Sequence, residues 1–287
     1  MNLNKLPIII VAAGRSGTKM LRGILASHPD VVCFPREINY IWRHGNARFP
    51  TDELTPAHAR PEVVRYIRRR FENFSAKHND LRVVEKTCAN VLRVDFVHAV
   101  FPEAYVIHLI RDGRAVAESA RRRWQTPNPL PYLLEKARWV PPSDVPYYAL
   151  RYLRYRLGSL RSSDSAYGSF GPRFTGLDKL IAEKTLIEVC GLQWKACVQA
   201  ADAAIKQLPS EQAVTVHYEN LVCDPLTNTQ EILSQVNLAF TAECCDYVER
   251  EVHAGNVNKW QEKLSAEDLR LLMPHIESEI SSLGYEL

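Results

Sequence analysis

Residues 7–21 read Pro7-Ile8-Ile9-Ile10-Val11-Ala12-Ala13-Gly14-Arg15-Ser16-Gly17-Thr18-Lys19-Met20-Leu21. The apolar, β-branched run at the start of this stretch predicts a fully buried central strand. Two glycines among small residues follow, and a helical pattern then begins with Leu21, Ile24 and Leu25 on one face. Glycines let several backbone N–H groups approach one anion, and the dipole of the following helix favours negative charge. The stretch therefore predicts a phosphate-binding loop between a strand and a helix.

This loop differs from the nucleotide-triphosphatase version, GxxxxGK[ST]. Thr18 stands where that motif has its Lys, Ala12 replaces its first glycine, and the basic residue of the loop is Arg15. The missing Lys and the Mg²⁺-binding hydroxyl beside it define triphosphate chemistry, so the loop predicts a phosphate binder of another kind. Taken alone, it can also be an ordinary strand–helix turn.

The bulk composition limits the class of protein. A chain of 287 residues with 46% hydrophobic and 24% charged residues can form one large globular α/β domain. Its apolar runs are far shorter than the roughly 20 residues that a membrane span needs, and the first strand begins too near Met1 for a signal peptide. Seven cysteines form no CxxC pair or metal-ligand spacing, and their odd number argues against a full disulfide framework. We therefore expect a cytoplasmic protein without a transmembrane segment or a metal.

The net charge of +3 is unevenly distributed along the chain. Residues 111–161 hold eleven Lys and Arg against four Asp and Glu, a local charge of +7, which leaves −4 for the remainder. An excess of this size often marks a site for an anion. Runs such as Arg121-Arg122-Arg123 can also form a solvated helix face, and this alternative stays open.

Strands and helices alternate along most of the chain. The further predicted strands are residues 31–34, 82–86, 104–110 and 213–217. The predicted helices include residues 63–71, 90–101, 115–124 and 190–208, and two more that open at the capping signals Asp224-Pro225 and Ser265-x-x-Asp268. This order predicts an α/β fold: a three-layer, P-loop-like domain with a mostly parallel central sheet and helices on both faces.

Residues 125–185 interrupt this alternation. They contain seven prolines and many aromatic residues, and their apolar content is too thin for a core of their own. We therefore expect residues 1–287 to form a single domain in which residues 125–185 are an insertion or lid.

A second anion signal follows the predicted strand at 104–110. This strand ends at Arg111, and Ser119 follows eight residues later on the next helix. Because the carboxyl ends of parallel strands gather at one edge of a sheet, Arg111 should emerge beside the Gly14–Thr18 loop. Two anion sites on one edge suggest a nucleotide phosphorylated at two places. An Arg-Asp-Gly turn that only satisfies its own hydrogen bonds is the alternative.

Taken together, these motifs resemble those of the sulfotransferases. The Gly14–Thr18 loop is similar to the family's 5′-phosphosulfate loop, and the segment from Phe101-Pro102 to Ser119 is similar to its 3′-phosphate motif. The resemblance covers most of the chain except residues 125–185. It implies a sulfotransferase that uses 3′-phosphoadenosine 5′-phosphosulfate (PAPS) as donor, releases adenosine 3′,5′-bisphosphate and needs no metal.

The resemblance also implies catalytic residues. Pro35-Arg36-Glu37 and Glu85-Lys86-Thr87 are similar to the segments that supply the catalytic Glu and Lys in the heparan-sulfate and tyrosylprotein branches. In the cytosolic steroid and phenol branch a His base follows the motif Lys by two residues, but Cys88 stands there in this chain. We therefore expect Glu37 to be the base, although a surface carboxylate paired with Arg36 is the alternative.

Sulfuryl transfer, like phosphoryl transfer, proceeds in line through a loose transition state, so positioning and charge stabilisation carry most of the catalysis. Glu37 would take the proton of an acceptor hydroxyl, and Lys86 and Arg15 would neutralise the leaving 5′-phosphate. Matches at His217–Leu221 and Gly255–Trp260 add further residues. The implied cofactor-binding residues are Gly14, Arg15, Ser16, Gly17, Thr18, Lys19, Arg111, Ser119, Tyr218, Lys259 and Trp260.

The acceptor is inferred from residues 125–185, which combine aromatic residues with arginines. The aromatics are Trp139, Tyr147, Tyr148, Tyr152 and Tyr155, and the arginines are Arg138, Arg151, Arg154 and Arg156. Aromatic faces suit sugars or lipid-like bodies, and arginines suit carboxylates. We expect a hydroxyl of an anionic saccharide or glycoconjugate, with a tyrosyl peptide or a lipid-like or small metabolite as the alternative.

Two other classes of protein compete with this interpretation. A P-loop nucleotide kinase could share the three-layer fold, but the missing GK[ST] argues against it. A non-catalytic binder of polyanions would explain the basic runs alone. No nucleic-acid-binding motif accompanies these runs, so we expect no nucleic-acid partner. The sequence indicates no particular oligomeric state.

Overall fold

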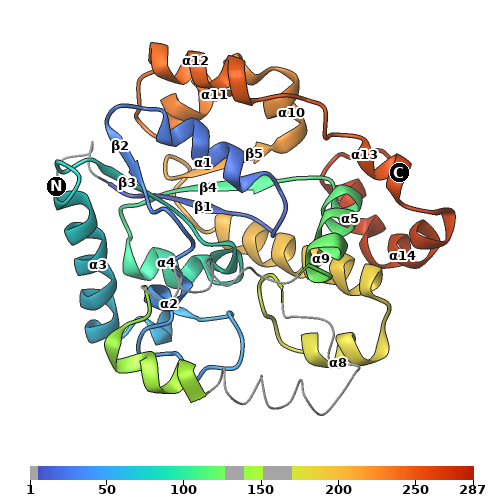
Figure 1. Cartoon of the computed structure of the whole chain (residues 1–287), viewed down its shortest axis with the longest axis horizontal. Coiled ribbons are helices and arrows are strands. Elements are labelled where there is room, and N and C mark those ends of the chain that lie inside the picture. Colours follow the sequence, from blue (N-terminus) through green and yellow to red (C-terminus); the bar gives the residue numbers. More distant parts are fainter. Residues whose placement is uncertain (1–5, 127–138, 151–169) are drawn as a thin grey trace.

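The computed structural model describes residues 6–126, 139–150 and 170–287. Within them, five parallel strands form one sheet in the order β2-β3-β1-β4-β5 (Figure 1). The strands are β1 (Ile8–Val11), β2 (Val31–Cys33), β3 (Arg82–Lys86), β4 (Tyr105–Ile110) and β5 (Ala213–His217). The expected parallel sheet is confirmed, and β1 lies at its centre with all four residues fully buried.

Helices cover both faces of the sheet, as predicted. One face carries α3 (Pro61–Ala76), α4 (Val94–Val100), α5 (Gly113–Trp124), α9 (Leu186–Ile205) and α14 (Ala266–Ser282). The other carries α1 (Thr18–Ala26), α10 (Tyr218–Cys223), α11 (Pro225–Gln235) and α12 (Ala242–Glu251). Shorter helices, α2 (Asn39–Trp42), α8 (Leu177–Glu183) and α13 (Lys259–Lys263), lie at the margins (Figure 1).

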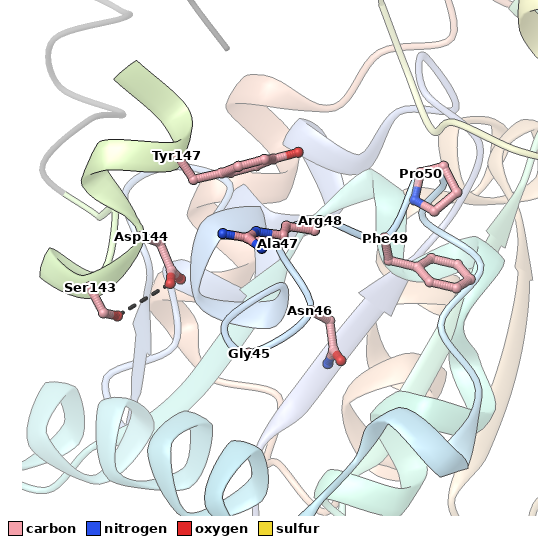
Figure 2. A pocket seen from close by; sticks show the side chains of 9 residues that line it. All are labelled: Gly45, Asn46, Ala47, Arg48, Phe49, Pro50, Ser143, Asp144 and Tyr147. Atoms are coloured by element: carbon pink, nitrogen blue, oxygen red, sulfur yellow. Dashed lines mark hydrogen bonds between the residues drawn. The ribbon is translucent and has the colours of Figure 1, made fainter. Parts of the chain in front are cut away.

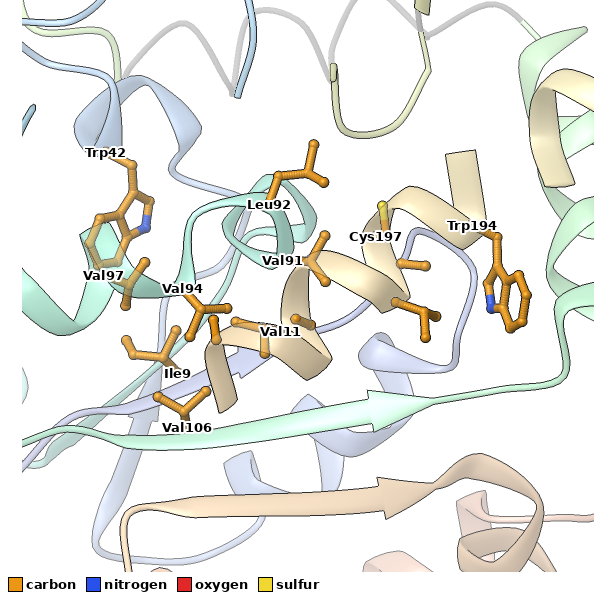
Figure 3. Close-up of a cluster of buried hydrophobic side chains, with 14 of the residues drawn as sticks. Ile9, Val11, Trp42, Val91, Leu92, Val94, Val97, Val106, Trp194 and Cys197 are labelled. Atoms are coloured by element: carbon orange, nitrogen blue, oxygen red, sulfur yellow. The ribbon is translucent and has the colours of Figure 1, made fainter. Parts of the chain in front are cut away.

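The sheet divides the core into two clusters because successive side chains of a strand point to opposite faces. Ile9 and Val11 of β1 pack with Val106, Trp194 and Cys197 on the α9 face (Figure 3). Alternate residues of the same strands face α1 and α11. This burial on both sides explains why β1 reads as an unbroken apolar run.

The helix predicted at residues 90–101 is wrong in its first part. Residues Cys88–Leu92 form a 3₁₀ turn, and the α-helix begins only at Val94. Arg93 separates the two with φ −147° and ψ 38°, which is not helical. Its guanidinium is fully buried and bonds to distant side chains, so tertiary contacts override the local helical pattern.

The predicted insertion at 125–185 is described only in part, and its role stays a prediction. Its residues 139–150 lie over the segment that follows β2: Trp139 packs edge-on against Phe34, and Tyr148 packs edge-on against Tyr40. The side chains of Arg138, Arg151, Tyr152, Arg154, Tyr155 and Arg156 lie outside the described residues. In the parts of the chain that the structure describes, none of the helices has both the length and the apolar character needed to cross a bilayer.

Candidate functional site

The loop between β1 and α1 leaves the start of its helix open. Arg15 and Gly17 adopt left-handed backbone conformations, with φ of 79° and 95°. Gly17 is the N-cap of α1, and no side chain caps the helix there. A Cβ atom on Gly17 would lie 2.5 Å from the Tyr218 ring, so only glycine fits. The N-terminal amides of α1 and its dipole are thus available to an anion.

The turn between β4 and α5 is built differently. Asp112 is the N-cap of α5, and its carboxylate accepts a hydrogen bond of 2.8 Å from the backbone N–H of Arg114. The same carboxylate pairs with the Arg114 guanidinium at 2.8 Å. Trp194 donates its indole N–H to the carbonyl of Arg111 at 3.1 Å and so fixes the end of β4. The start of α5 is therefore capped by its own carboxylate.

The two loops meet, as the sequence predicted. Arg15 Nε donates a hydrogen bond of 3.0 Å to Ser119 Oγ, across 104 residues of sequence. Arg111 Nη1 donates to the carbonyl oxygen of Arg15 at 3.3 Å, and the Arg111 guanidinium lies 4.2 Å from the centre of the Tyr218 ring. The structure thus brings the residues expected to bind the 5′- and 3′-phosphates into one group at the carboxyl edge of the sheet.

This group concentrates positive charge. Partial burial lowers the pKa of Arg15, and the nearby positive charges of Arg122, Arg123 and Arg111 lower it further, while Cys88 opposes them. Arginines held this close repel one another unless an anion lies among them. Guanidinium groups, a hydroxyl and an open helix N-terminus are donors that suit phosphate, so the residues present fit a nucleotide bisphosphate.

The two expected catalytic side chains form an ion pair. Lys86 Nζ lies 2.7 Å from Glu37 Oε1, and the two side chains are 10% and 25% exposed. Burial tends to lower the pKa of Lys86, but the neighbouring Cys88 and Glu37 side chains, and the hydrogen bond that Lys86 donates to Glu37, outweigh it, so the pKa is raised. Arg22 of α1 donates to the carbonyl of Pro35 at 3.1 Å, which ties the Glu37 segment to the helix of the phosphate loop.

Two alternative bases fit this site poorly. Burial raises the pKa of the Cys88 thiol to about 12, so it stays protonated at neutral pH. His108 is 2% exposed within β4, and burial lowers its pKa to about 4. His108 is therefore a core histidine.

The remaining residues predicted to bind the cofactor lie around this group. Ser16 and Thr18 are buried in the loop, and Lys19 is exposed on the first turn of α1. Lys259 Nζ donates to Asn256 Oδ1 at 2.7 Å, and the Asn256 carbonyl accepts a hydrogen bond of 2.7 Å from Arg111. This contact places the 255–260 segment against Arg111.

Trp260 lies on a different side of this segment. Its ring faces the Arg114 guanidinium at 4.2 Å rather than Arg111. Since Arg114 also pairs with Asp112, the ring packs where α13 meets the capped start of α5. Its expected part in cofactor binding stays a prediction.

Sequence reasoning missed a buried polar network behind Glu37 and Lys86. Glu85 and Thr87 were noted only as neighbours of Lys86, yet both are fully buried and hydrogen-bonded to each other. The available signal was a carboxylate inside an otherwise apolar strand, Arg82–Lys86. Burying a charge is costly unless it is paired, so such a residue usually has a specific partner.

A cavity of about 520 Å³ lies where the insertion meets the loop after α2. It is lined by residues 45–50 and by Ser143, Asp144 and Tyr147 (Figure 2). The Asp144 carboxylate lies 3.1 Å from the ring of His44, which holds the two walls together. The cavity is therefore a hollow beneath the described part of the insertion.

One comparison with known proteins finds a family for the first half of the chain. The family model described as the sulfotransferase family matches residues 7–139, which include the phosphate loop, Glu37, Lys86, Arg111 and Ser119. A search of curated proteins finds no significant match.

The fold is similar to that of several solved sulfotransferases. The sulfotransferase domain from the curacin biosynthetic pathway shares 15% identity over 99% of both chains, with a TM-score of 0.59. Sulfotransferase STF9 from Mycobacterium avium shares 14% identity over 99% of this chain and 78% of that one, with a TM-score of 0.56. Mouse sulfotransferase SULT7A1 complexed with PAP shares 12% identity over 98% and 88%, with a TM-score of 0.50. Residues 7–139 thus match the sulfotransferase family, and the chain as a whole has the fold of the solved sulfotransferases.

Proposed function

We propose that this enzyme moves a sulfuryl group from PAPS to an acceptor hydroxyl, with Glu37 as general base and Lys86 and Arg15 as charge stabilisers. The observation that carries the proposal is the Lys86–Glu37 pair at 2.7 Å beside the phosphate loop. The Cys88 thiol contacts Glu37, Lys86 and the loop residue Thr18, so the pair and the loop share one small space. A base and a cation next to a phosphate cradle are what this transfer needs.

The proposed donor site follows the two loops. Residues 14–19 would hold the 5′-phosphosulfate with backbone amides and cationic side chains, and Arg111 and Ser119 would hold the 3′-phosphate. Tyr218, Lys259 and Trp260 would complete the site. That the mouse protein of similar fold is complexed with PAP supports this choice of nucleotide.

The ion pair has a defined use in the proposed reaction. Lys86 keeps Glu37 ionised, because a nearby positive charge favours the carboxylate form. Glu37 takes the proton as the acceptor oxygen forms its bond to sulfur and the bond from sulfur to the 5′-phosphate oxygen breaks. Lys86 and Arg15 then stabilise the negative charge that collects on the phosphate. Aligned groups of this kind contribute mainly through positioning and preorganised charge.

The acceptor is proposed to be a hydroxyl of an anionic saccharide or glycoconjugate. Trp139 packs against Phe34 and Tyr148 against Tyr40, so the two aromatic side chains lie over the segment on either side of Glu37. The nearby cavity is lined by Arg48 and Asn46, which can bind carboxylate and hydroxyl groups. Phe170, whose ring lies near Gly14 and 5.5 Å from the Arg123 guanidinium, would add an aromatic face beside the phosphate loop.

A lipid-like or small-metabolite acceptor is the second candidate. Val145 and Leu150, on the same described part of the insertion, are 48% and 49% exposed. Exposed apolar side chains beside an acceptor site favour an apolar substrate body. The fold is also similar to a domain from the curacin biosynthetic pathway, a sulfotransferase of metabolite biosynthesis by its name.

Glu37→Gln tests the proposed base. The substitution keeps the shape of the side chain but removes the proton acceptor, so we expect turnover to fall by roughly 10²–10⁴. Sulfur-labelled PAPS with pools of desulfated glycosaminoglycan oligosaccharides, tyrosyl peptides and hydroxylated lipids measures turnover and identifies the acceptor class. Affinity for adenosine 3′,5′-bisphosphate, measured by calorimetry, should hardly change. Wild-type turnover by Glu37→Gln would contradict the assignment, and a thermal shift with ATP–Mg²⁺ but not with the bisphosphate would favour a kinase.

A further inference from the structure

We propose that Glu85 and Thr87 are positioning residues that hold the backbone behind Glu37 through a directional chain of hydrogen bonds. The inference rests on the proposed role of Glu37 as the base. It addresses how the Glu37 carboxylate, which lies on a loop, is held beside the Lys86 ammonium group, which lies on a strand.

The chain begins at the residue that follows Glu37. The backbone N–H of Ile38 donates to Thr87 Oγ1 at 3.0 Å, and both residues are fully buried. Because the Thr87 oxygen accepts this bond, its own hydrogen is free to donate elsewhere. It donates to Glu85 Oε1, two residues back in the chain, in β3.

Glu85 receives donors on both oxygens. Asn90 Nδ2 donates to Glu85 Oε2 at 2.9 Å, opposite the Thr87 bond. The orientation of the Asn90 amide is fixed, because its Oδ1 accepts from Arg93 Nε at 2.9 Å and from Arg93 Nη2 at 2.7 Å. An arginine can only donate, so Asn90 must turn its NH₂ group toward Glu85. With Glu85 ionised, Thr87 and Asn90 both donate to it, so each of its oxygens accepts one hydrogen bond.

The chain also closes on the other side of Ile38. Arg93 Nη2 donates to Asn39 Oδ1, so residues 38 and 39 are both tied to the same network. Lys86, the last residue of β3, lies between Glu85 and Thr87 in the chain. The network therefore fixes the Glu37 backbone relative to the strand that carries Lys86, and sets the geometry of the 2.7 Å pair.

The carboxylate form of Glu85 is what this arrangement needs. Burial raises the pKa of Glu85 to about 7, while the hydrogen bond from Thr87 acts to lower it. A buried carboxylate is costly, and a Gln of the same shape cannot accept on both sides. Glu85→Gln would turn its NH₂ group either toward the Thr87 hydroxyl, which would then have to accept the bond instead of donating it, or toward the Asn90 NH₂ group, where the bond would be lost.

The experiment compares three variants in the full chain. Thr87→Val removes the hydroxyl at nearly constant shape, Thr87→Ser restores it, and Glu85→Gln breaks the acceptor pattern. Turnover is measured as release of adenosine 3′,5′-bisphosphate from PAPS with the acceptor pool described above, and with water as the reference acceptor. Thr87→Val and Glu85→Gln should lose about 10- to 100-fold in turnover, since a misplaced base costs this much, and Thr87→Ser should retain most of it. Affinity for the bisphosphate should stay within about twofold in all three, which also shows that each variant is folded.

A double variant separates positioning from plain stability. In a Glu37→Gln background the base is already gone, so adding Thr87→Val should cost no further turnover. The same fold-loss in both backgrounds would mean that Thr87 does not act through Glu37, and would overturn the inference. So would wild-type turnover in Thr87→Val or Glu85→Gln.

The outcomes also keep the two proposals apart. If Glu37→Gln is inactive but the Thr87 variants act independently, only the positioning role falls. If Glu37→Gln retains wild-type turnover, the proposed base itself is wrong and the positioning role falls with it.

Discussion

The turns after β1 and β4 follow neighbouring strands at the carboxyl edge of the sheet, but the helices that they lead into begin differently. After β1, Arg15 and Gly17 adopt left-handed backbone conformations, and no side chain caps α1. After β4, Asp112 caps α5 with its own carboxylate. The comparison shows that only α1 can offer its helix terminus to an anion, because the corresponding position at α5 is already taken by a negative charge.

Anion binding at the two turns must therefore rest on different parts of the chain. At the α1 turn, anion binding would depend on the conformation of the backbone. A substitution can change this conformation only by introducing steric strain. At the α5 turn it would depend on side chains, chiefly Arg111 and Ser119, which can be removed singly. Three changes test this division, and a fourth, at His108, tests the strand beneath the turns.

The largest effect is expected for Gly17→Ala. The new Cβ would lie 2.5 Å from the Tyr218 ring, and the backbone would be held at φ 95°, so the loop must shift. We expect affinity for adenosine 3′,5′-bisphosphate, measured by calorimetry, to fall by more than about 100-fold. Gly176→Ala is the matched control: Gly176 is also a helix N-cap with φ 89°, but nothing lies within 4 Å of its Cβ position. Tight nucleotide binding by Gly17→Ala would break the comparison.

The second test concerns His108 of β4, which is in register with Val11 of β1 inside the sheet, before the two turns begin. Burial lowers the pKa of His108 to about 4, so the folded state takes up the proton at a lower pH than the unfolded state does. His108 therefore contributes stability that is present above about pH 6.5 and lost as the pH falls toward 4, up to about 3 kcal/mol. In His108→Leu this part of the acid dependence should disappear from urea unfolding curves measured between pH 4 and 7. An equal loss of stability with acid in both proteins would contradict the assignment.

Arg111→Ala tests the side-chain half of the comparison. Removing one charge-assisted contact to the 3′-phosphate should cost about 1.5–3 kcal/mol, roughly 10- to 100-fold in affinity for the 3′,5′-bisphosphate. Affinity for adenosine 5′-phosphate should change much less. Lys19→Ala, on the 5′ side, is the control and should weaken both nucleotides alike. Equal affinity of the wild type for the two nucleotides would refute a 3′-phosphate site at Arg111.

The smallest effect on binding is expected for Asp112→Ala. It removes the cap of α5 and the partner of Arg114, so the free energy of unfolding should fall by about 1–2 kcal/mol. Nucleotide affinity should stay within about twofold. Asp224→Ala removes a similar cap from α11, away from the site, and serves as the control for stability. A tenfold change in nucleotide affinity for Asp112→Ala would show that the cap takes part in binding.

Features encoded over a few residues were predictable from the sequence. The β1 run, the caps at Asp224 and Ser265, and the strand that ends at Arg111 were all expected, and the structure confirms them. Each depends on hydrophobic periodicity or on a side chain that reaches a backbone group three residues away.

Features that depend on contacts between distant residues could not be predicted this way. The helix expected to begin near Asn90 fails at Arg93, because that guanidinium bonds Asn39, 54 residues away. The direct bond between Arg15 and Ser119 depends on β1 and β4 being neighbours in the sheet. The role of Glu85 needs the Glu37 loop folded behind it, so its sequence signal was only a charge inside a strand.

The Tyr218 ring affects which nucleotides can fit the proposed donor site. Tyr218 is 4% exposed and lies between the two turns, with Gly17 against one part of its ring and the Arg111 guanidinium 4.2 Å from its centre. Under the proposed binding mode, the Tyr218 ring, together with the Arg15–Ser119 bond, would hold the two phosphate sites at a fixed distance from each other. An isomer such as a 2′,5′-bisphosphate has the same charge but a different distance between its two phosphates. Such an isomer would therefore occupy only one of the two proposed phosphate sites at a time.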